Sequence, residues 1–418
     1  MGDHVPESVT RQPVAGPRPH ARRPGPATCL YAARALRDFG DGFVAVLLAV
    51  YLAELGLGAF EVGVVSTTAL LGSSLITLAI GVYAPPAGQR RLLLAASALM
   101  IATGLAFAAA DSYALILLIA LVGTINPTAG NVSIFVPMEH ALLAGVAPDA
   151  SRTRMFAVYG LVGALAAAVG SLAAGLPELL VATGWTRLAA LRAMFVLYAA
   201  LGLAGGLMYR LVPRAAAASG ERAHFALGPS KRIVYRLAAL FSVDAFAGGF
   251  AVQSLMALWL FQKFGMSLAA AGLFFFGSGL LAAFSYPAAA WIAARIGLVN
   301  TMVWTHVPSS LCLIGAALVP DLQVALALLL ARSALSQMDV PTRSSYVMAV
   351  VTPRERAAAA SVTSVPRGLA SAASPALAGA LFAAGLSAWP FVICGALKIA
   401  YDFALLWSFR HLKPPEER

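Results

Sequence analysis

The chain has 418 residues, of which 60% are hydrophobic and only 11% are charged, and its mean hydropathy is +0.82. Soluble domains carry about 25% charged residues, and a soluble chain of this length could not bury so much apolar surface. The net charge of +11 suits a nucleic-acid ligand at first sight. The lysines and arginines, however, lie mainly between the apolar segments, so they indicate topology rather than nucleic-acid binding.

Apolar segments of about 20 residues recur along the whole chain. Each is long enough to cross a ~30 Å hydrocarbon core as a helix, and none shows the alternating pattern of a barrel strand. A helix also satisfies its own backbone hydrogen bonds in lipid. We therefore predict an all-α polytopic membrane protein with twelve transmembrane helices near 29–53, 60–83, 92–110, 113–136, 155–178, 189–209, 235–260, 268–292, 299–319, 323–343, 357–384 and 389–409.

The distribution of basic residues predicts the orientation of these helices. With the N-terminus inside, the cytoplasmic segments hold most of the Lys and Arg, as the positive-inside rule requires. Residues 1–28 are rich in Pro and Arg and lack the apolar core of a signal peptide, so we expect a disordered cytoplasmic tail. An Ala-, Leu- and Arg-rich composition with few lysines indicates a bacterial source and hence the cytoplasmic (inner) membrane.

A long polar interruption at 210–232 divides the chain into halves of six helices each. We assign 29–209 and 233–410 to two bundles, 210–232 to a central cytoplasmic loop and 411–418 to a second cytoplasmic tail. Glycines repeat between the halves at a spacing of 209 residues: Gly56 matches Gly265, Gly63 matches Gly272 and Gly88 matches Gly297. Two parallel six-helix halves around an axis along the membrane normal are a known transporter plan.

The loop after the second predicted helix carries both glycines and the basic end of a family motif: Gly81, Gly88, Arg90 and Arg91. With this motif and the repeat, the chain resembles the major facilitator superfamily over essentially all of 29–410. The family's acidic and basic pair is replaced by Pro85 and Pro86. The resemblance implies two pseudo-symmetric bundles, a substrate site between them, transport by alternating access, and a cytoplasmic gate that includes Arg90 and Arg91.

The first predicted helix carries four charged residues on one face: Arg34, Arg37, Asp38 and Asp41. Arg34 and Asp38 are four residues apart, as are Arg37 and Asp41, and this spacing predicts two ion pairs. Charged groups inside a bilayer cost on the order of 3 kcal/mol each, so a chain that keeps them commonly uses them. We expect Asp41, with Arg37, to act in proton coupling or substrate contact; the alternative is a static pair that anchors the helix.

The second half has its own membrane-embedded charges. Asp244, Arg332 and Arg367 are further candidates for proton coupling or substrate binding, and Arg332 could instead pair with Asp244. Lys398 and Asp402, four residues apart in a helix expected at the periphery, are predicted to form a structural ion pair. Four residues near the cytoplasmic helix ends are expected to belong to a gate: Glu139, His140, Asp339 and Arg343.

Two transport directions remain open from the sequence. Gly160, Gly163, Gly170 and Gly175 partly match an exporter motif of the family, which together with Asp41 favours a proton-coupled exporter working by antiport. Small residues also serve close helix packing, and Arg332 and Arg367 favour a proton-coupled symporter that imports an organic anion or another small solute.

Other classes of protein fit less well. The sequence has no HExxH, no Gly-x-Ser-x-Gly and no Walker A loop, so neither an enzyme nor direct use of ATP is expected. Three separate cysteines, Cys29, Cys312 and Cys394, make neither a disulfide framework nor a zinc site. We expect a monomer that needs no cofactor or metal and whose partners are the bilayer, protons and a small-molecule substrate, and no nucleic acid.

Overall fold

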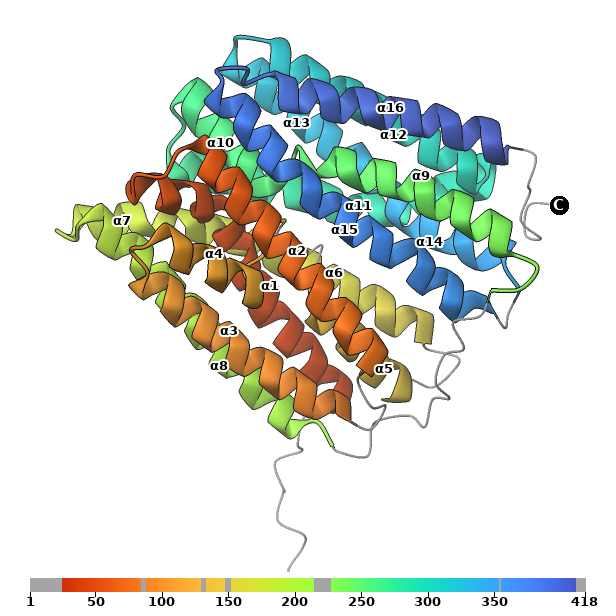
Figure 1. Cartoon of the computed structure of the whole chain (residues 1–418), viewed down its shortest axis with the longest axis horizontal. Coiled ribbons are helices and arrows are strands. Elements are labelled where there is room, and N and C mark those ends of the chain that lie inside the picture. The colour runs from red at the N-terminus through yellow and green to blue at the C-terminus, as the bar shows by residue number, and fades with distance from the viewer. Residues whose placement is uncertain are drawn as a thin grey trace, which may run out of the picture.

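The computed structural model describes residues 25–83, 88–128, 133–146, 152–213, 227–352 and 355–410. Within these ranges every regular element is a helix (Figure 1). Both predicted tails fall almost wholly outside them, as do Pro85 and Pro86.

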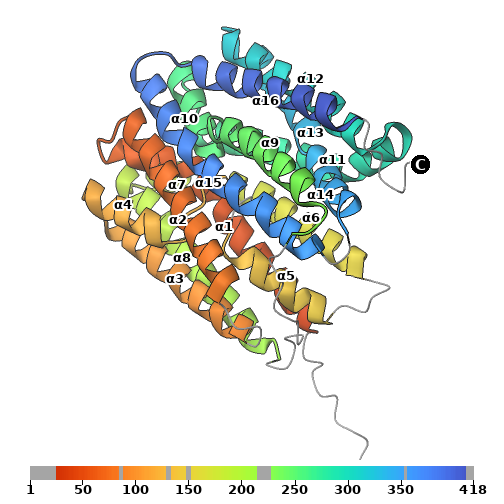
Figure 2. The ribbon, with the colours of Figure 1, turned by 45° about the vertical axis from the view of Figure 1, so that its right-hand side comes forward.

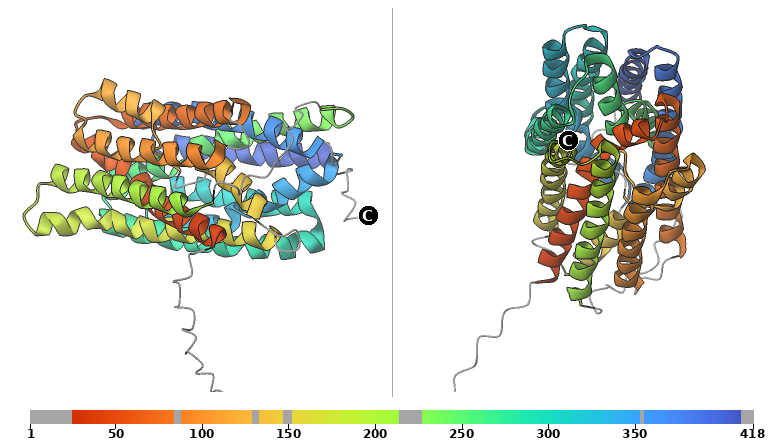
Figure 3. Two further views of the ribbon diagram at one scale, coloured as in Figure 1. Left: turned by 90° about the horizontal axis from the view of Figure 1, so that it is seen from below. Right: turned by 90° about the vertical axis from the view of Figure 1, so that its left-hand side faces the viewer.

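The helices of both halves run along one common axis of the molecule (Figure 3, left). The first half comprises α1 (Pro26–Glu54), α2 (Ala59–Tyr83), α3 (Gln89–Ala109), α4 (Tyr113–Val122), α5 (Phe135–Val146), α6 (Arg152–Leu172), α7 (Leu176–Ala182) and α8 (Arg187–Leu211). The second half comprises α9 (Lys231–Gly249), α10 (Gln253–Phe264), α11 (Leu268–Ile296), α12 (Leu298–Leu318), α13 (Leu322–Ser336), α14 (Asp339–Val350), α15 (Arg356–Ala383) and α16 (Trp389–Phe409).

These helices account for the twelve predicted membrane crossings. In the described part of the chain, nine helical stretches are long and apolar enough to span a bilayer by length and composition alone. The other three crossings are α1, the α4–α5 pair and α15. The helices α1 and α15 have 29 and 28 residues, which is ample length, but both carry buried or cavity-facing charges.

Three crossings that we predicted as continuous helices are interrupted, so that part of the prediction was wrong. The fourth breaks between α4 and α5, the seventh between α9 and α10, and the tenth between α13 and α14. Pro127 lies in the first break, where a proline cannot donate the backbone hydrogen bond that a helix needs. Its carbonyl instead accepts a hydrogen bond from the Ser254 backbone N–H (3.2 Å) at the start of α10. A hydrogen bond between the two halves thus satisfies backbone groups in the irregular segments of two crossings.

The halves pack against each other through two equivalent helix pairs. The helix α15 lies along α2 and also along α9 (Figure 2), and α11 lies along α6. In crossing numbers, these inter-half contacts join the second to the eleventh and the fifth to the eighth. Exchanging the halves turns one pair into the other, which is the signature of a pseudo-two-fold arrangement.

The repeated glycines explain how the halves approach so closely. A Cβ on Gly63 would lie 2.5 Å from the Pro375 carbonyl oxygen of α15, and a Cβ on Gly272 would lie 2.5 Å from the Ser171 carbonyl oxygen of α6. Neither space admits a side chain. Because lipid is as apolar as leucine, close backbone packing of this kind is a main source of helix association in membranes.

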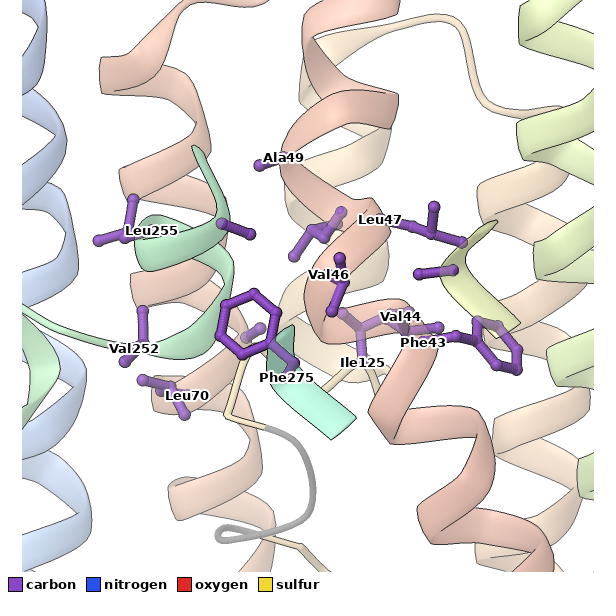
Figure 4. Packing of buried hydrophobic residues seen from close by; sticks show 14 of the residues in the cluster. Phe43, Val44, Val46, Leu47, Ala49, Leu70, Ile125, Val252, Leu255 and Phe275 are labelled. Atoms are coloured by element: carbon purple, nitrogen blue, oxygen red, sulfur yellow. The ribbon is translucent and has the colours of Figure 1, made fainter. Parts of the chain in front are cut away.

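An apolar cluster joins the halves at one end of the molecule. We call the side where α1 begins and α16 ends the terminal side, and the other the distal side. Val46 of α1, Leu70 of α2, Leu255 of α10 and Phe275 of α11 meet in this cluster (Figure 4), which we call the apolar seal. The halves diverge from there toward the terminal side (Figure 1), where the second half has a separate apolar core of its own.

Candidate functional site

A central cavity of about 620 Å³ lies between the two halves. Its walls come from α2, α5 and α6 of the first half and from all eight helices of the second half. Val252 and Phe275 line the cavity and also belong to the apolar seal (Figure 4). The seal therefore bounds the cavity on its distal side. Ligand pockets in proteins commonly measure about 300–1,000 Å³, so this cavity has room for a small molecule.

Among the residues that the structure describes, the charged side chains of the cavity wall all belong to the second half. Four are basic and two are acidic, and one histidine accompanies them. The set is Arg332, Arg343, Arg367, Lys398, Asp244, Asp339 and His306. The five polar side chains that the first half contributes to the wall are all neutral hydroxyls: Ser74, Thr77, Thr128, Ser133 and Ser171.

Asp244 of α9 is the centre of a buried ion-pair network. Its carboxylate accepts from Lys398 Nζ of α16 (2.6 Å) and from Arg343 of α14 (3.0 Å). Arg343 also pairs with Asp339 (3.1 Å), four residues earlier. The partners of Asp244 thus come from other helices, and the predicted alternative partner, Arg332, is not among them.

The predicted structural pair of Lys398 and Asp402 is wrong. Lys398 lines the cavity and binds Asp244, whereas Asp402 pairs with His306 Nδ1 (3.0 Å) on α12. The other ring nitrogen of His306 lies 3.3 Å from Lys398 Nζ. Lys398 and Asp402 thus lie one turn apart on α16 and both point inward, but they have different partners. Buried charges need counter-charges; α9 supplies one for Lys398 and α12 supplies one for Asp402.

Arg332 and Arg367 differ from the other basic residues of the cavity. Both are half-buried and line the wall, on α13 and α15. In the described part of the chain no carboxylate lies within ion-pair distance of either guanidinium. The Nε of Arg367 is buried and has no hydrogen-bond partner there. These two residues leave positive charge available to a ligand.

The first half holds a second buried polar cluster, which is not part of the cavity wall. Arg37 of α1 pairs with Glu139 of α5 (2.8 Å), whose carboxylate also accepts from the hydroxyls of Tyr159 (2.5 Å) and Tyr209 (2.6 Å). Glu139 is fully buried. With three donors, this carboxylate is well satisfied, and it fastens α5 to α1, α6 and α8.

The charges of α1 pair only partly as predicted. The Arg34–Asp38 pair is confirmed, with 2.6 Å between Nε and Oδ2. The Arg37–Asp41 pair is wrong, because Arg37 turns to Glu139 and Asp38. Asp41 instead accepts from the Tyr198 hydroxyl (3.4 Å) of α8. Neither Arg37 nor Asp41 is among the described residues that line the cavity.

The main buried ion pair occupies equivalent positions in the two halves, with the acidic and basic residues exchanged. The dipeptide Gly-Phe occurs in both halves, at Gly42 and at Gly249, and Arg37 and Asp244 each lie five residues before that glycine. Glu139 and Arg343 are each the fifth residue of the helix that follows the break, α5 and α14. The ion pair is therefore Arg37–Glu139 in one half and Asp244–Arg343 in the other.

The residues predicted to form a gate lie in three separate places. Arg90 donates to the backbone carbonyls of Tyr209 and Arg210, while Arg91 is exposed. His140 packs edge-on against Phe156 and Tyr159. Asp339 and Arg343 line the cavity with Asp244. A gating role for them stays a prediction.

Two pseudo-symmetric halves of six crossings each, with a cavity between them, are a known plan of membrane transporters. The family model described as Major Facilitator Superfamily matches residues 30–331 and 237–418. The chain therefore belongs to the major facilitator superfamily, a family of membrane transporters rather than enzymes. In the ranges that the structure describes, no group of three or more His, Cys, Asp or Glu side chains could hold a metal ion.

Relatives agree with this assignment. An uncharacterized membrane protein of Saccharomyces cerevisiae is 24% identical over 416 residues, covering 91% of this chain and 93% of its own length. The nucleoside transporter NupG has a similar fold, with a TM-score of 0.72 at 14% identity over 93% of this chain and all of its own. A bacterial homologue of the human lysosomal transporter Spinster gives 0.67 at 18% identity over 93% and 97%.

Proposed function

We propose that this protein is a proton-coupled secondary transporter whose substrate is a small organic anion bound in the central cavity. The observation that carries the proposal is the pair of cavity arginines, Arg332 and Arg367, that no carboxylate neutralises among the described residues. Buried arginines without counter-ions are costly in a membrane. An anionic substrate supplies the missing charge.

The remaining cavity charges support the same substrate class. Asp244 and Asp339 are both engaged by Arg343, and Asp244 by Lys398 as well. Their negative charge is thus balanced within the network. A cavity in which basic side chains outnumber acidic ones focuses a positive potential on a ligand that enters it.

For proton coupling, the proposal rests on Asp41 in the first half and Asp244 in the second. Asp41 has a tyrosine hydroxyl as its partner at 3.4 Å, so it can change its charge without breaking an ion pair. Asp244 lies in the cavity wall between Lys398, Arg343 and His306. An anion that binds near this network competes with Asp244 for the same cations, which links substrate binding to the charge of the carboxylate.

For direction, we favour import by symport over export by antiport. Two of the four glycines that suggested an exporter motif serve packing of α6 against α1: a Cβ on Gly163 would meet the Arg34 and Asp38 side chains, and one on Gly170 would meet the backbone of α1. An anion that enters with a proton also carries less net charge across the bilayer. We propose, in addition, that the terminal side is cytoplasmic and the membrane is the bacterial inner membrane.

Flux into proteoliposomes tests this function. Purified protein is reconstituted, and uptake of labelled gluconate, acetate, glucose and choline is measured with an inwardly directed proton gradient. We expect uptake of an anion, and we expect Arg332→Gln and Arg367→Gln each to reduce it at least about tenfold, since a charge-assisted hydrogen bond contributes about 1.5–3 kcal/mol. Arg187→Gln, at an exposed arginine beside Glu54, is the matched control and should transport normally.

Flux measurements in the same proteoliposomes show whether transport is coupled to protons and whether it occurs by symport or antiport. Symport predicts that collapsing the proton gradient abolishes accumulation and that Asp41→Asn transports without accumulating. Accumulation driven by an outwardly directed proton gradient would establish antiport instead. Uptake of choline or glucose that survives both arginine substitutions, with no uptake of any anion, would contradict the proposed function.

A further inference from the structure

The cavity wall contains more hydrogen-bonding side chains than an anionic group alone requires. Among the described residues, ten serines and two threonines line it, together with Gln253 and Gln337. Aromatic carbon rings are few by comparison, with only Phe275 and Tyr286 in the same wall. The wall therefore favours an oxygen-rich ligand over an aromatic one.

Several of these polar groups have no hydrogen-bond partner in the part of the chain that the structure describes. Ser310 of α12 is 2% exposed, and its hydroxyl forms no hydrogen bond. The Ser74 hydroxyl, Gln253 Nε2 and Arg367 Nε are likewise buried atoms without a partner. All four side chains line the cavity. A buried polar atom left unsatisfied costs about 1–3 kcal/mol, which a bound ligand with several acceptors would recover.

The unsatisfied groups lie on helix segments that pack together in the same cavity wall as the two arginines. Ser74 of α2 packs against the α15 segment that carries Arg367, because a Cβ on Gly368 would lie 2.8 Å from the Ser74 hydroxyl. Ser310 follows Ser309, whose hydroxyl donates to the Arg332 backbone carbonyl (3.4 Å), so α12 packs against α13 at this level. One of these hydroxyls comes from the first half and one from the second.

A further donor set lies toward the distal end of the cavity. Gln253 is the first residue of α10, a twelve-residue helix whose N-terminus has no side-chain cap. The backbone N–H groups at a helix N-terminus carry partial positive charge. With Gln253 Nε2 unpartnered beside them among the described residues, this end of the cavity also offers hydrogen-bond donors.

We propose that the substrate is a polyhydroxylated organic anion, a sugar acid or a sugar phosphate. Its anionic group binds Arg332 and Arg367, and its hydroxyls bind Ser74, Ser310 and Gln253. This inference rests on the proposed function and narrows it. Since Ser74 belongs to the first half and the arginines to the second, such a ligand bridges the halves.

The test is equilibrium binding to the full-length protein in detergent, measured by isothermal titration calorimetry with matched six-carbon probes. Gluconate carries both charge and hydroxyls, hexanoate only charge and glucose only hydroxyls, while glucose 6-phosphate replaces the carboxylate by a phosphate. We expect gluconate or glucose 6-phosphate to bind at least about tenfold more tightly than hexanoate or glucose. Which of these two binds more tightly distinguishes a sugar acid from a sugar phosphate.

Two variants probe the hydroxyls directly. Ser310→Ala and Ser74→Ala should each weaken binding of the sugar anion about three- to tenfold, the contribution of one hydrogen bond, and leave hexanoate unchanged. Ser242→Ala is the control, because Ser242 bonds within α9 (2.7 Å to the Ala238 carbonyl) and does not line the cavity. If one serine variant fails to fold, the other still answers the question.

The outcomes distinguish a failure of this inference from a failure of the proposed function. Hexanoate binding as tightly as gluconate would overturn the inference and leave anion transport standing. Glucose binding as tightly as gluconate would contradict the anionic substrate itself. No binding of either sugar anion at about 10 mM, well above the millimolar range of weak ligands, would also overturn the inference, whatever anion the flux assay identifies.

Discussion

At the scale of single residues, the buried ion pairs divide into those that lie within one half and those that line the central cavity. The Glu139 carboxylate accepts hydrogen bonds from Arg37 and from two tyrosine hydroxyls. This cluster does not line the cavity. Breaking a buried pair leaves one uncompensated charge and costs about 3–5 kcal/mol, whereas removing both partners costs much less. The Arg37–Glu139 pair therefore has a testable energetic signature.

A double-mutant cycle measures that signature. We expect Arg37→Gln and Glu139→Gln each to lower the free energy of unfolding by about 3–5 kcal/mol. The double variant should be more stable than the sum of the two losses predicts, by more than about 1 kcal/mol. The measurement is reversible unfolding in mixed micelles.

The exposed pair of Arg192 and Asp111 is the control, because surface pairs couple by about 1 kcal/mol or less. A coupling energy for Arg37 and Glu139 no larger than that of the surface pair would refute a stabilising role for the buried cluster.

At the scale of helices, one carboxylate outside the membrane holds the starts of α9 and α15 together. Glu355, just before α15, accepts from Ser230 Oγ (2.7 Å) at the start of α9 and from Thr352 Oγ1 (2.6 Å). The backbone N–H of Gly228 donates to it as well. The N-termini of both helices favour a negative charge at this point.

This carboxylate predicts a pH dependence of stability. Hydrogen bonds from the Thr352 and Ser230 side chains hold the pKa of Glu355 at about 2, below its ordinary value of 4.5. A lowered pKa in the folded state adds stability that is complete above the unfolded-state value and disappears as the pH falls toward the folded-state value. Wild type should thus melt at a higher temperature than Glu355→Gln from pH 7 down to about 5, with the difference shrinking from there to about pH 2.

Thermal unfolding in detergent at several pH values measures this, with Glu61→Gln, at an acidic residue in the first turn of α2, as the control for a generic loss of charge. A constant difference between wild type and Glu355→Gln across the acidic range would show that the carboxylate charge does not matter.

The helices illustrate what the sequence could and could not predict. Apolar length fixed the positions of the crossings, and the glycine repeat identified the halves, since Gly56 and Gly265 both adopt positive φ (80° and 62°) at equivalent turns. The breaks at Pro127 and before Gln253 were not predicted. They depend on a hydrogen bond between halves, and hydropathy contains no information on such a partner.

The prediction of ion-pair partners from the sequence failed for the same reason. Spacing of four residues correctly paired Arg34 with Asp38. It wrongly paired Lys398 with Asp402, because their true partners lie on other helices. A pattern within one helix shows which residues share a face but not which charge another helix presents to that face.

At the scale of the whole molecule, the two halves have the same fold but different roles at the cavity. In the described ranges, the second half supplies the charged residues of the wall and the first half supplies hydroxyls. The apolar seal bounds the cavity on the distal side (Figure 4). A ligand held by both halves can pull them together on the terminal side, which is how alternating access uses binding energy.

The most direct test of the central claim is an experimental structure of the protein with glucose 6-phosphate or gluconate bound at saturating concentration. Our account predicts ligand density in the central cavity, with its anionic group within about 3 Å of the guanidinium nitrogens of both Arg332 and Arg367. Density confined to any other part of the protein, or an anionic group that contacts neither arginine, would contradict it.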